Sequence, residues 1–150
     1  MRLALDEFLP YRLSVAANAV SQVIARAYAA EHALSTQQWR LLAVLAEGGR
    51  LTQRDLVERT KMDKVTVSRA ARSLEERALL RRVLNTRDAR SWRVSLTPAG
   101  RRLYVAIRPA ALAGERAVLA VLDARERNEL RSLLERVEQA AVRALAVSKP

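Results

Sequence analysis

Residues 51–80, LTQRDLVERTKMDKVTVSRAARSLEERALL, contain two helical patterns separated by a short break. The first begins at Thr52, a residue type that caps helices, and carries Leu56 and Val57. After the break, Asp63 is a favourable N-cap for the second helix. Two short helices joined by a few residues predict a helix-turn-helix, whose second helix enters the major groove of DNA. The apolar residues of that second helix recur at helical spacing: Val65, Val67, Ala70, Ala71 and Leu74.

Two extended patterns follow the second helix. Residues 80–84 are short and apolar at both ends, and residues 92–96 alternate apolar and polar side chains. Residues 85–91 between them are polar and include three charged side chains. The pattern predicts a two-stranded β-hairpin with a basic tip, which is the wing of a winged helix-turn-helix.

Amphipathic helices are predicted on both sides of this centre. Residues 9–31 have apolar side chains at helical spacing over more than five turns, and the segment after Asp123 repeats Leu and Val in the same way. Such long apolar stripes need a partner surface, either a second copy of the chain or the chain's own domain. We therefore expect a mainly α single domain, 1–150, with a winged helix-turn-helix lobe at 34–104 and dimerisation helices at 1–33 and 105–150.

The positive charge is concentrated in the middle of the chain. The formal net charge is +11, and residues 50–104 hold 15 basic and six acidic residues, a net of +9. Residues 1–49 are neutral, and residues 105–150 carry +2. A basic segment between near-neutral flanks is typical of nucleic-acid binding. Because almost all these cations are arginine, composition alone also allows a codon bias that merely places arginines on solvated helices.

Several other functions are excluded or disfavoured by residues that the chain lacks. The absence of Cys excludes disulfides, Cys-ligated zinc and thiol-based redox sensing, and a single histidine gives no basis for a His-ligated metal site. The chain has four Gly and no nucleophile–base pair or phosphate-binding loop, so we expect neither an enzyme nor a cofactor. The longest uncharged stretch, 13–25, is too short and too polar to span a membrane, which favours a cytoplasmic protein.

Candidate contacts to double-stranded DNA lie on the second helix and on the wing. Arginine can grip guanine in a bidentate way, and hydroxyl groups bind either base edges or phosphates. Each of these residues has the alternative role of a solvated polar group, and Arg69 has the further alternative of bonding to the preceding helix. A polar tip with two arginines suits the minor groove, and an acid between them can orient an arginine or form an ordinary hairpin ion pair. The candidates are Gln53, Lys64, Thr66, Ser68, Arg69, Arg72, Arg87, Asp88 and Arg90.

In these residues the chain resembles the MarR family of winged helix-turn-helix transcription regulators. Four motifs carry the resemblance, in order along residues 34–100. They are Leu34-Ser35-x-x-Gln38-Trp39-x-x-Leu42, Leu51-Thr52-Gln53-x-x-Leu56, Asp63-x-x-x-Val67-Ser68-Arg69-x-x-x-x-Leu74 and Asp88-x-Arg90-x-x-x-Val94-x-Leu96-Thr97-x-x-Gly100. One departure is Ala78, where the family usually has Gly; because Ala tolerates left-handed geometry poorly, we expect this helix exit to differ or the helix to run longer.

The resemblance implies a homodimer whose two second helices and two wings bind a pseudo-palindromic operator, with Arg90 as the wing arginine and Asp88 as its supporting acid. It also implies a repressor that a small molecule, often an aromatic acid, releases from DNA by entering a cleft between the dimerisation helices and the lobe. Alternatively, Trp39 and Tyr11 are core residues and His32 merely ends a helix. The residues that would line this cleft are Tyr11, Arg12, His32, Trp39 and Arg40.

Two other binding functions share the same basic middle. A non-specific architectural DNA-binding protein needs no effector and little discrimination between bases. A winged-helix adaptor would bind another protein instead of DNA. Affinity for specific and scrambled duplexes at equal salt separates the first alternative from a regulator, and retention on heparin or random duplex tests the second.

Overall fold

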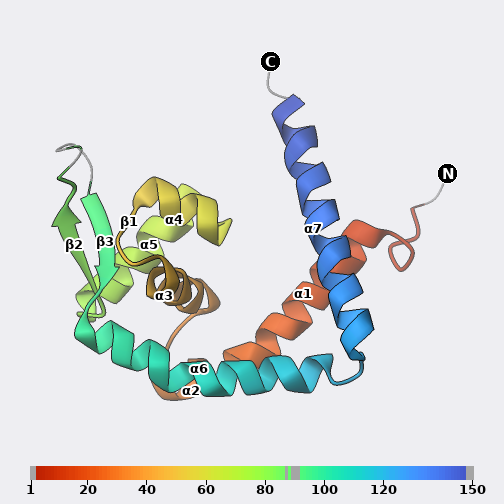
Figure 1. The fold of residues 1–150 in the computed structure, drawn as a ribbon, viewed down its shortest axis with the longest axis horizontal. Helices are drawn as coiled ribbons and strands as arrows, with labels where there is room; N and C mark the ends of the chain where they lie inside the picture. The colour runs from red at the N-terminus through yellow and green to blue at the C-terminus, as the bar shows by residue number, and fades with distance from the viewer. Residues whose placement is uncertain (1–2, 87, 89–91, 148–150) are drawn as a thin grey trace. The chain divides into compact units, whose positions relative to one another are not determined.

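The computed structural model describes residues 3–86, 88 and 92–147 (Figure 1). It divides into two compact units, 1–115 and 116–150, with α6 crossing the boundary. The elements in chain order are α1 (Leu9–Ala25), α2 (Ala29–His32), α3 (Thr36–Gly48), β1 (Leu51–Thr52), α4 (Gln53–Thr60), α5 (Lys64–Glu76), β2 (Leu80–Leu84), β3 (Trp92–Leu96), α6 (Pro98–Leu119) and α7 (Ala124–Val147).

The predicted lobe has a hydrophobic core that α3, α4, α5 and the sheet share. Leu41, Leu42 and Leu45 of α3 are fully buried, together with Leu56 of α4 and Leu74 of α5. Figure 1 shows these three helices gathered beside the β2–β3 hairpin. The apolar spacing that predicted each helix therefore supplies the side chains of one common core.

The helices of the lobe begin at the residues that the sequence indicated. Ser35 and Gln38 form a capping box at the start of α3, and Thr52 and Asp55 form another at the start of α4. Asp63 caps α5, accepting a hydrogen bond from the Thr66 amide at 2.8 Å. Because these local bonds fix each helix start, the turn between α4 and α5 is determined over a few residues.

The sheet has three strands, in the order β1-β3-β2, so it contains the predicted two-stranded wing and one strand that was not predicted. Strands β2 and β3 pair in the predicted hairpin, with Leu80 opposite Leu96 and Leu84 opposite Trp92. The additional strand β1 is two residues long and pairs antiparallel with β3, placing Leu51 opposite Val94. Two residues cannot show an alternating pattern, so this strand forms only because folding brings the end of α3 beside β3.

The predicted helix over 9–31 was wrong in its length. Helix α1 ends at Ala25, and a turn precedes the four-residue helix α2. At this turn Tyr28 is buried at 1% exposure, and its hydroxyl donates a hydrogen bond to Thr36 Oγ1 at 3.2 Å. Packing of this one side chain into the lobe outweighs the local preference for continuous helix.

The end of α5 differs from the expectation for Ala78. The helix does not run longer but ends at Glu76, and Ala78 itself adopts the left-handed conformation, with φ of 55°. The amides of Ala78 and Leu79 donate to the carbonyls of Glu75 and Leu74, both at 2.9 Å, which is the hydrogen-bond pattern of a Schellman motif. Buried Leu74 and Leu79 hold this geometry although its alanine is strained.

The terminal helices contribute little to the core of a single chain. Helix α6 buries Gly100, Ile107 and Ala111, whereas α1 and α7 contain no buried residue. Gly100 is required because a Cβ there would lie 2.1 Å from the Leu79 carbonyl oxygen. Within residues 3–86, 88 and 92–147, no helix combines the length and the hydrophobicity that a membrane crossing needs.

Candidate nucleic-acid interface

The outer face of α5 presents the predicted groove-reading side chains. Lys64, Arg69 and Arg72 are exposed, and Thr66 and Ser68 are partly buried. Four of these five line a shallow hollow of about 500 Å³ along the helix, Thr66 being the exception. Helix α5 therefore brings cations and a hydroxyl together on one surface, as a recognition helix requires.

Val65 belongs to this outer face and not to the core, contrary to the sequence pattern. It is 59% exposed and lines the same hollow as Arg69 and Arg72. The buried stripe of α5 runs through Val67, and a residue two positions away lies about 200° around a helix of 3.6 residues per turn. Helical geometry alone thus places Val65 among the candidate DNA contacts, where sequence reasoning had missed it.

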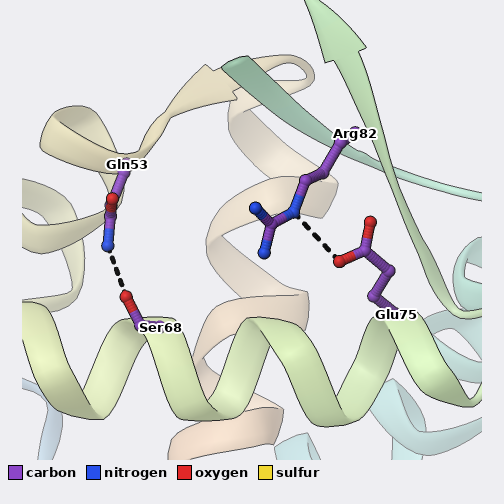
Figure 2. Close-up of polar contacts among 4 residues, drawn as sticks. All are labelled: Gln53, Ser68, Glu75 and Arg82. Atoms are coloured by element: carbon purple, nitrogen blue, oxygen red, sulfur yellow. Dashed lines mark hydrogen bonds and ion pairs between the residues drawn. The ribbon is translucent and has the colours of Figure 1, made fainter. Parts of the chain in front are cut away.

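Two side-chain contacts tie one face of α5 to neighbouring elements (Figure 2). Gln53 Nε2, at the start of α4, donates a hydrogen bond to Ser68 Oγ at 2.5 Å. Two of the predicted DNA contacts are therefore hydrogen-bonded to each other. Two helical turns further along, Glu75 accepts a hydrogen bond from Arg82 Nε of β2 at 2.9 Å and forms an ion pair with it. The sequence left open that Arg69 bonds to the preceding helix. In the structure, Ser68 makes the bond to that helix, α4, through Gln53.

Carboxylates reinforce the start of both helices of the motif. Hydrogen bonds from the side chain and the amide of Thr66 lower the pKa of Asp63, and bonds from the amide and hydroxyl of Thr52 lower the pKa of Asp55. Both groups therefore stay ionised near neutral pH, where their negative charge also complements the positive helix N-termini. The Thr66 hydroxyl donates a hydrogen bond to Asp63 Oδ2 at 2.6 Å, so this predicted DNA contact is part of the N-cap of α5.

A groove of about 460 Å³ separates α4 and α5 from the wing strands. It is lined by Arg54, Arg82 and Trp92, none of which the sequence argument selected as a DNA contact. Trp92 is 51% exposed although it lies on the same strand face as buried Val94, and Leu84 opposite it is also exposed, so the core ends before this pair. The detectable signal was the strand alternation, which placed Trp92 in phase with Val94 and Leu96.

The wing tip is described only in part. Arg87 and Arg90, the predicted minor-groove arginines, lie outside the described residues. Asp88 is exposed, and its backbone amide donates to the Asn85 carbonyl at 3.2 Å. The roles of all three residues at the tip accordingly stay predictions.

The five residues predicted to line an effector cleft do not gather in one place. Trp39 is stacked between Tyr28 and Tyr104, with ring centroids 5.5 and 5.6 Å away, as expected for a core residue. Tyr11 and Arg12 are exposed near the start of α1, and His32 Nε2 lies 3.8 Å from Glu31 Oε2. Of the five, Arg40 alone is among the residues that line a polar groove of about 530 Å³.

This groove, the α1 groove, lies between α1 and the lobe. Helix α1 contributes Asn18, Ser21 and Gln22, and α3 contributes Arg40. On the opposite side it is lined by residues 61–63 and Thr66, the turn and the first part of α5. A molecule in this groove would touch both a terminal helix and the cap of the recognition helix.

The described residues offer no site for metal chemistry. Across 3–86, 88 and 92–147, no group of three or more His, Asp or Glu side chains is arranged to hold a metal ion. The polar groups that do converge are arginines, amides and hydroxyls on the outer face of α5, in the groove beside the wing strands and in the α1 groove.

Comparison with known proteins identifies the family. A family model described as the MarR family matches residues 33–91. A probable transcriptional regulator from Pseudomonas aeruginosa is 32% identical, with 89% of this chain and 99% of that chain covered and a TM-score of 0.78. The chain belongs to the MarR family. A search of the curated proteins gave no significant match.

Two further MarR-type structures extend the comparison. One is Bordetella bronchiseptica BpsR, whose DNA binding is regulated by 6-hydroxynicotinic acid. BpsR is 25% identical to this chain, with 87% of this chain and 98% of BpsR covered and a TM-score of 0.79. A MarR-family transcriptional regulator from Silicibacter pomeroyi is 26% identical over 91% of this chain and 94% of its own, with a TM-score of 0.76. Both cover the chain well beyond the lobe, so the terminal helices are part of the shared fold.

Proposed function

We propose that this MarR-family chain is a homodimeric transcription regulator, and not an enzyme, that represses genes from a pseudo-palindromic operator. The observation that carries the proposal is the outer face of α5, where Lys64, Arg69 and Arg72 are exposed together. The net charge of +9 over residues 50–104 adds the sequence-independent attraction to phosphate. Helix α5 would read the major groove while the β2–β3 wing reaches the adjacent minor groove.

The dimer is inferred from helix α7. Its apolar stripe stays exposed in a single chain, with Leu133, Leu134 and Val137 between 45% and 51% accessible. Exposed apolar stripes of this length are typical of helices that pack against another copy. A two-fold dimer would present two α5 helices to successive major grooves.

Binding to the chain's own promoter and to scrambled DNA at equal salt tests this function. We expect the promoter to bind far more tightly and the affinity to fall steeply with salt, because each neutralised phosphate releases counterions. Equal affinities would instead support the architectural DNA-binding alternative. Absence of any retention on random duplex at low salt would support the protein adaptor.

Single arginines test the geometry of the interface. Arg69→Ala on α5 and Arg90→Ala on the wing should each weaken operator binding by about 1–3 kcal/mol. Arg108→Ala is a matched control, because Arg108 is exposed on α6 and its substitution removes the same charge outside the helix-turn-helix. An operator affinity that Arg90→Ala leaves unchanged would contradict the role of the wing.

We further propose that the α1 groove binds a small effector with a carboxylate. Arg40 would pair with the carboxylate, and the amides and hydroxyls of Asn18, Ser21 and Gln22 would bind its polar ring substituents. The regulation of BpsR by 6-hydroxynicotinic acid supports a hydroxylated aromatic acid as the class to test. Because the groove also touches Asp63 and Thr66, an occupant would act directly on the start of α5.

Thermal stabilisation by aromatic acids tests the effector. A ligand that binds only the folded protein raises its melting temperature, and Arg40→Gln should abolish that rise. Arg26→Gln serves as the control, because Arg26 is exposed at the end of α1 and is not among the groove-lining residues. Stabilisation that survives Arg40→Gln would place the ligand elsewhere.

A further inference from the structure

The hollow on the outer face of α5 combines one apolar side chain with hydrogen-bond donors. Val65 is the apolar member, at 59% exposure, and Lys64, Ser68, Arg69 and Arg72 surround it. An exposed valine contributes little to folding and is a poorer helix former than the lysine or arginine beside it. Its position at the start of a recognition helix therefore calls for a role outside the chain's own core.

We infer that Val65 reads the 5-methyl group of a thymine in the major groove. This inference rests on the proposed operator binding and specifies what the recognition helix selects. The thymine methyl is the apolar feature that base edges present in the major groove, and contact with an apolar side chain is how proteins detect it. Val65 lies in the N-terminal half of α5, the part of such a helix that contacts base edges.

The surrounding side chains restrict the bases beside that thymine. Lysine and arginine only donate hydrogen bonds, and Ser68 Oγ already accepts one from Gln53 Nε2 at 2.5 Å, which leaves its hydroxyl hydrogen to donate. Among the residues that the structure describes, those lining the hollow have no side-chain carboxylate or amide oxygen. The hollow consequently favours edges that carry acceptors without an amino donor, namely those of thymine (O4) and guanine (O6 and N7), over the edges of cytosine and adenine, which carry an amino group.

Replacement of thymine by deoxyuridine tests the inference, because it removes the methyl and leaves the base pair and phosphates unchanged. Duplexes are first selected from a random pool with the wild-type protein, and each thymine of the selected site is then replaced in turn. We expect one position in each half-site at which the affinity falls about fourfold, the effect of one lost buried methyl. That thymine should be flanked by guanine or by another thymine on the strand that α5 contacts.

Val65→Ala provides the matched protein variant. It should bind the selected site about fourfold more weakly per half-site and lose its sensitivity to deoxyuridine at the same position. Val105→Ala, at a valine 50% exposed on α6, should keep the wild-type sensitivity. Since both side chains are exposed and alanine is the better helix former, neither variant should lower the melting temperature.

The outcomes separate this inference from the proposed function. A selected site with no deoxyuridine-sensitive thymine, or a Val65→Ala protein as sensitive as the wild type, overturns the role of Val65 and leaves operator binding intact. A pool from which no sequence is enriched overturns both, because a protein without base preference reads no methyl group.

Discussion

The winged helix-turn-helix lobe and helix α7 have similarly periodic apolar residues but opposite burial. In the lobe, the 13-residue helix α5 buries four side chains, and Leu41, Leu42 and Leu45 of α3 are fully inaccessible. In α7, 24 residues include no buried side chain, although the leucines recur at the same spacing. Periodicity therefore predicts a helix in both regions, but it does not say whether the partner of the apolar face is in the same chain.

The largest expected effect comes from breaking the apolar stripe of α7. Leu134→Glu should convert the protein to a monomer at micromolar concentration and weaken operator binding by about 100-fold or more, because two linked half-site contacts become one. Size-exclusion chromatography with light scattering, followed by operator titration, measures both. Ser132→Glu, which adds the same charge two positions and about 200° away from Leu134 on α7, should leave the dimer intact. A dimeric Leu134→Glu protein would refute this assignment of the interface.

The next effect distinguishes a core within one chain from one between chains. Leu42→Ala should lower the free energy of unfolding by about 2–5 kcal/mol at every protein concentration, since Leu42 is fully buried in the lobe. Leu133→Ala should destabilise to a degree that changes with protein concentration, as expected for a residue buried only on assembly. Denaturation at two concentrations tenfold apart tests both. A concentration-dependent effect of Leu42→Ala would contradict the comparison.

A smaller effect concerns the strained exit of α5. Ala78→Gly should raise the free energy of unfolding by about 1 kcal/mol, because Ala78 has φ of 55° and glycine adopts this conformation without steric cost. Ala110→Gly, at an exposed interior position of α6, should lower it by about the same amount. Chemical denaturation that gives both variants the same sign would show that the left-handed geometry of Ala78 carries no strain.

The smallest effect tests the tie between the recognition helix and the wing. Glu75→Gln should lower the free energy of unfolding by about 0.2–1 kcal/mol, because it removes the partly exposed ion pair with Arg82. Glu76→Gln removes the same charge from the next position of α5, so the difference between the two variants isolates the pair. If the two denaturation curves coincide, the contact contributes nothing to the lobe.

Much of the candidate interface followed from local sequence. Caps at Ser35, Thr52 and Asp63 fixed where the helices begin, since a capping bond spans only three residues. The two wing strands agreed with the structure residue for residue, because alternation and the polar tip between them are local features. Val65 differed because the phase of a side chain on its helix, and not its polarity, decides what it faces.

The sequence by itself determined the order of the elements, the MarR-family motif and the location of positive charge, because each of these depends on neighbouring residues. The tertiary structure decided which contacts between distant residues form. Strand β1 pairs with β3, Tyr28 enters the lobe at the turn that follows α1, and Trp39 stacks with Tyr104. Contacts between residues far apart in the chain form only when burial of the core offsets the entropy lost on loop closure. No local sequence pattern encodes which of these contacts form.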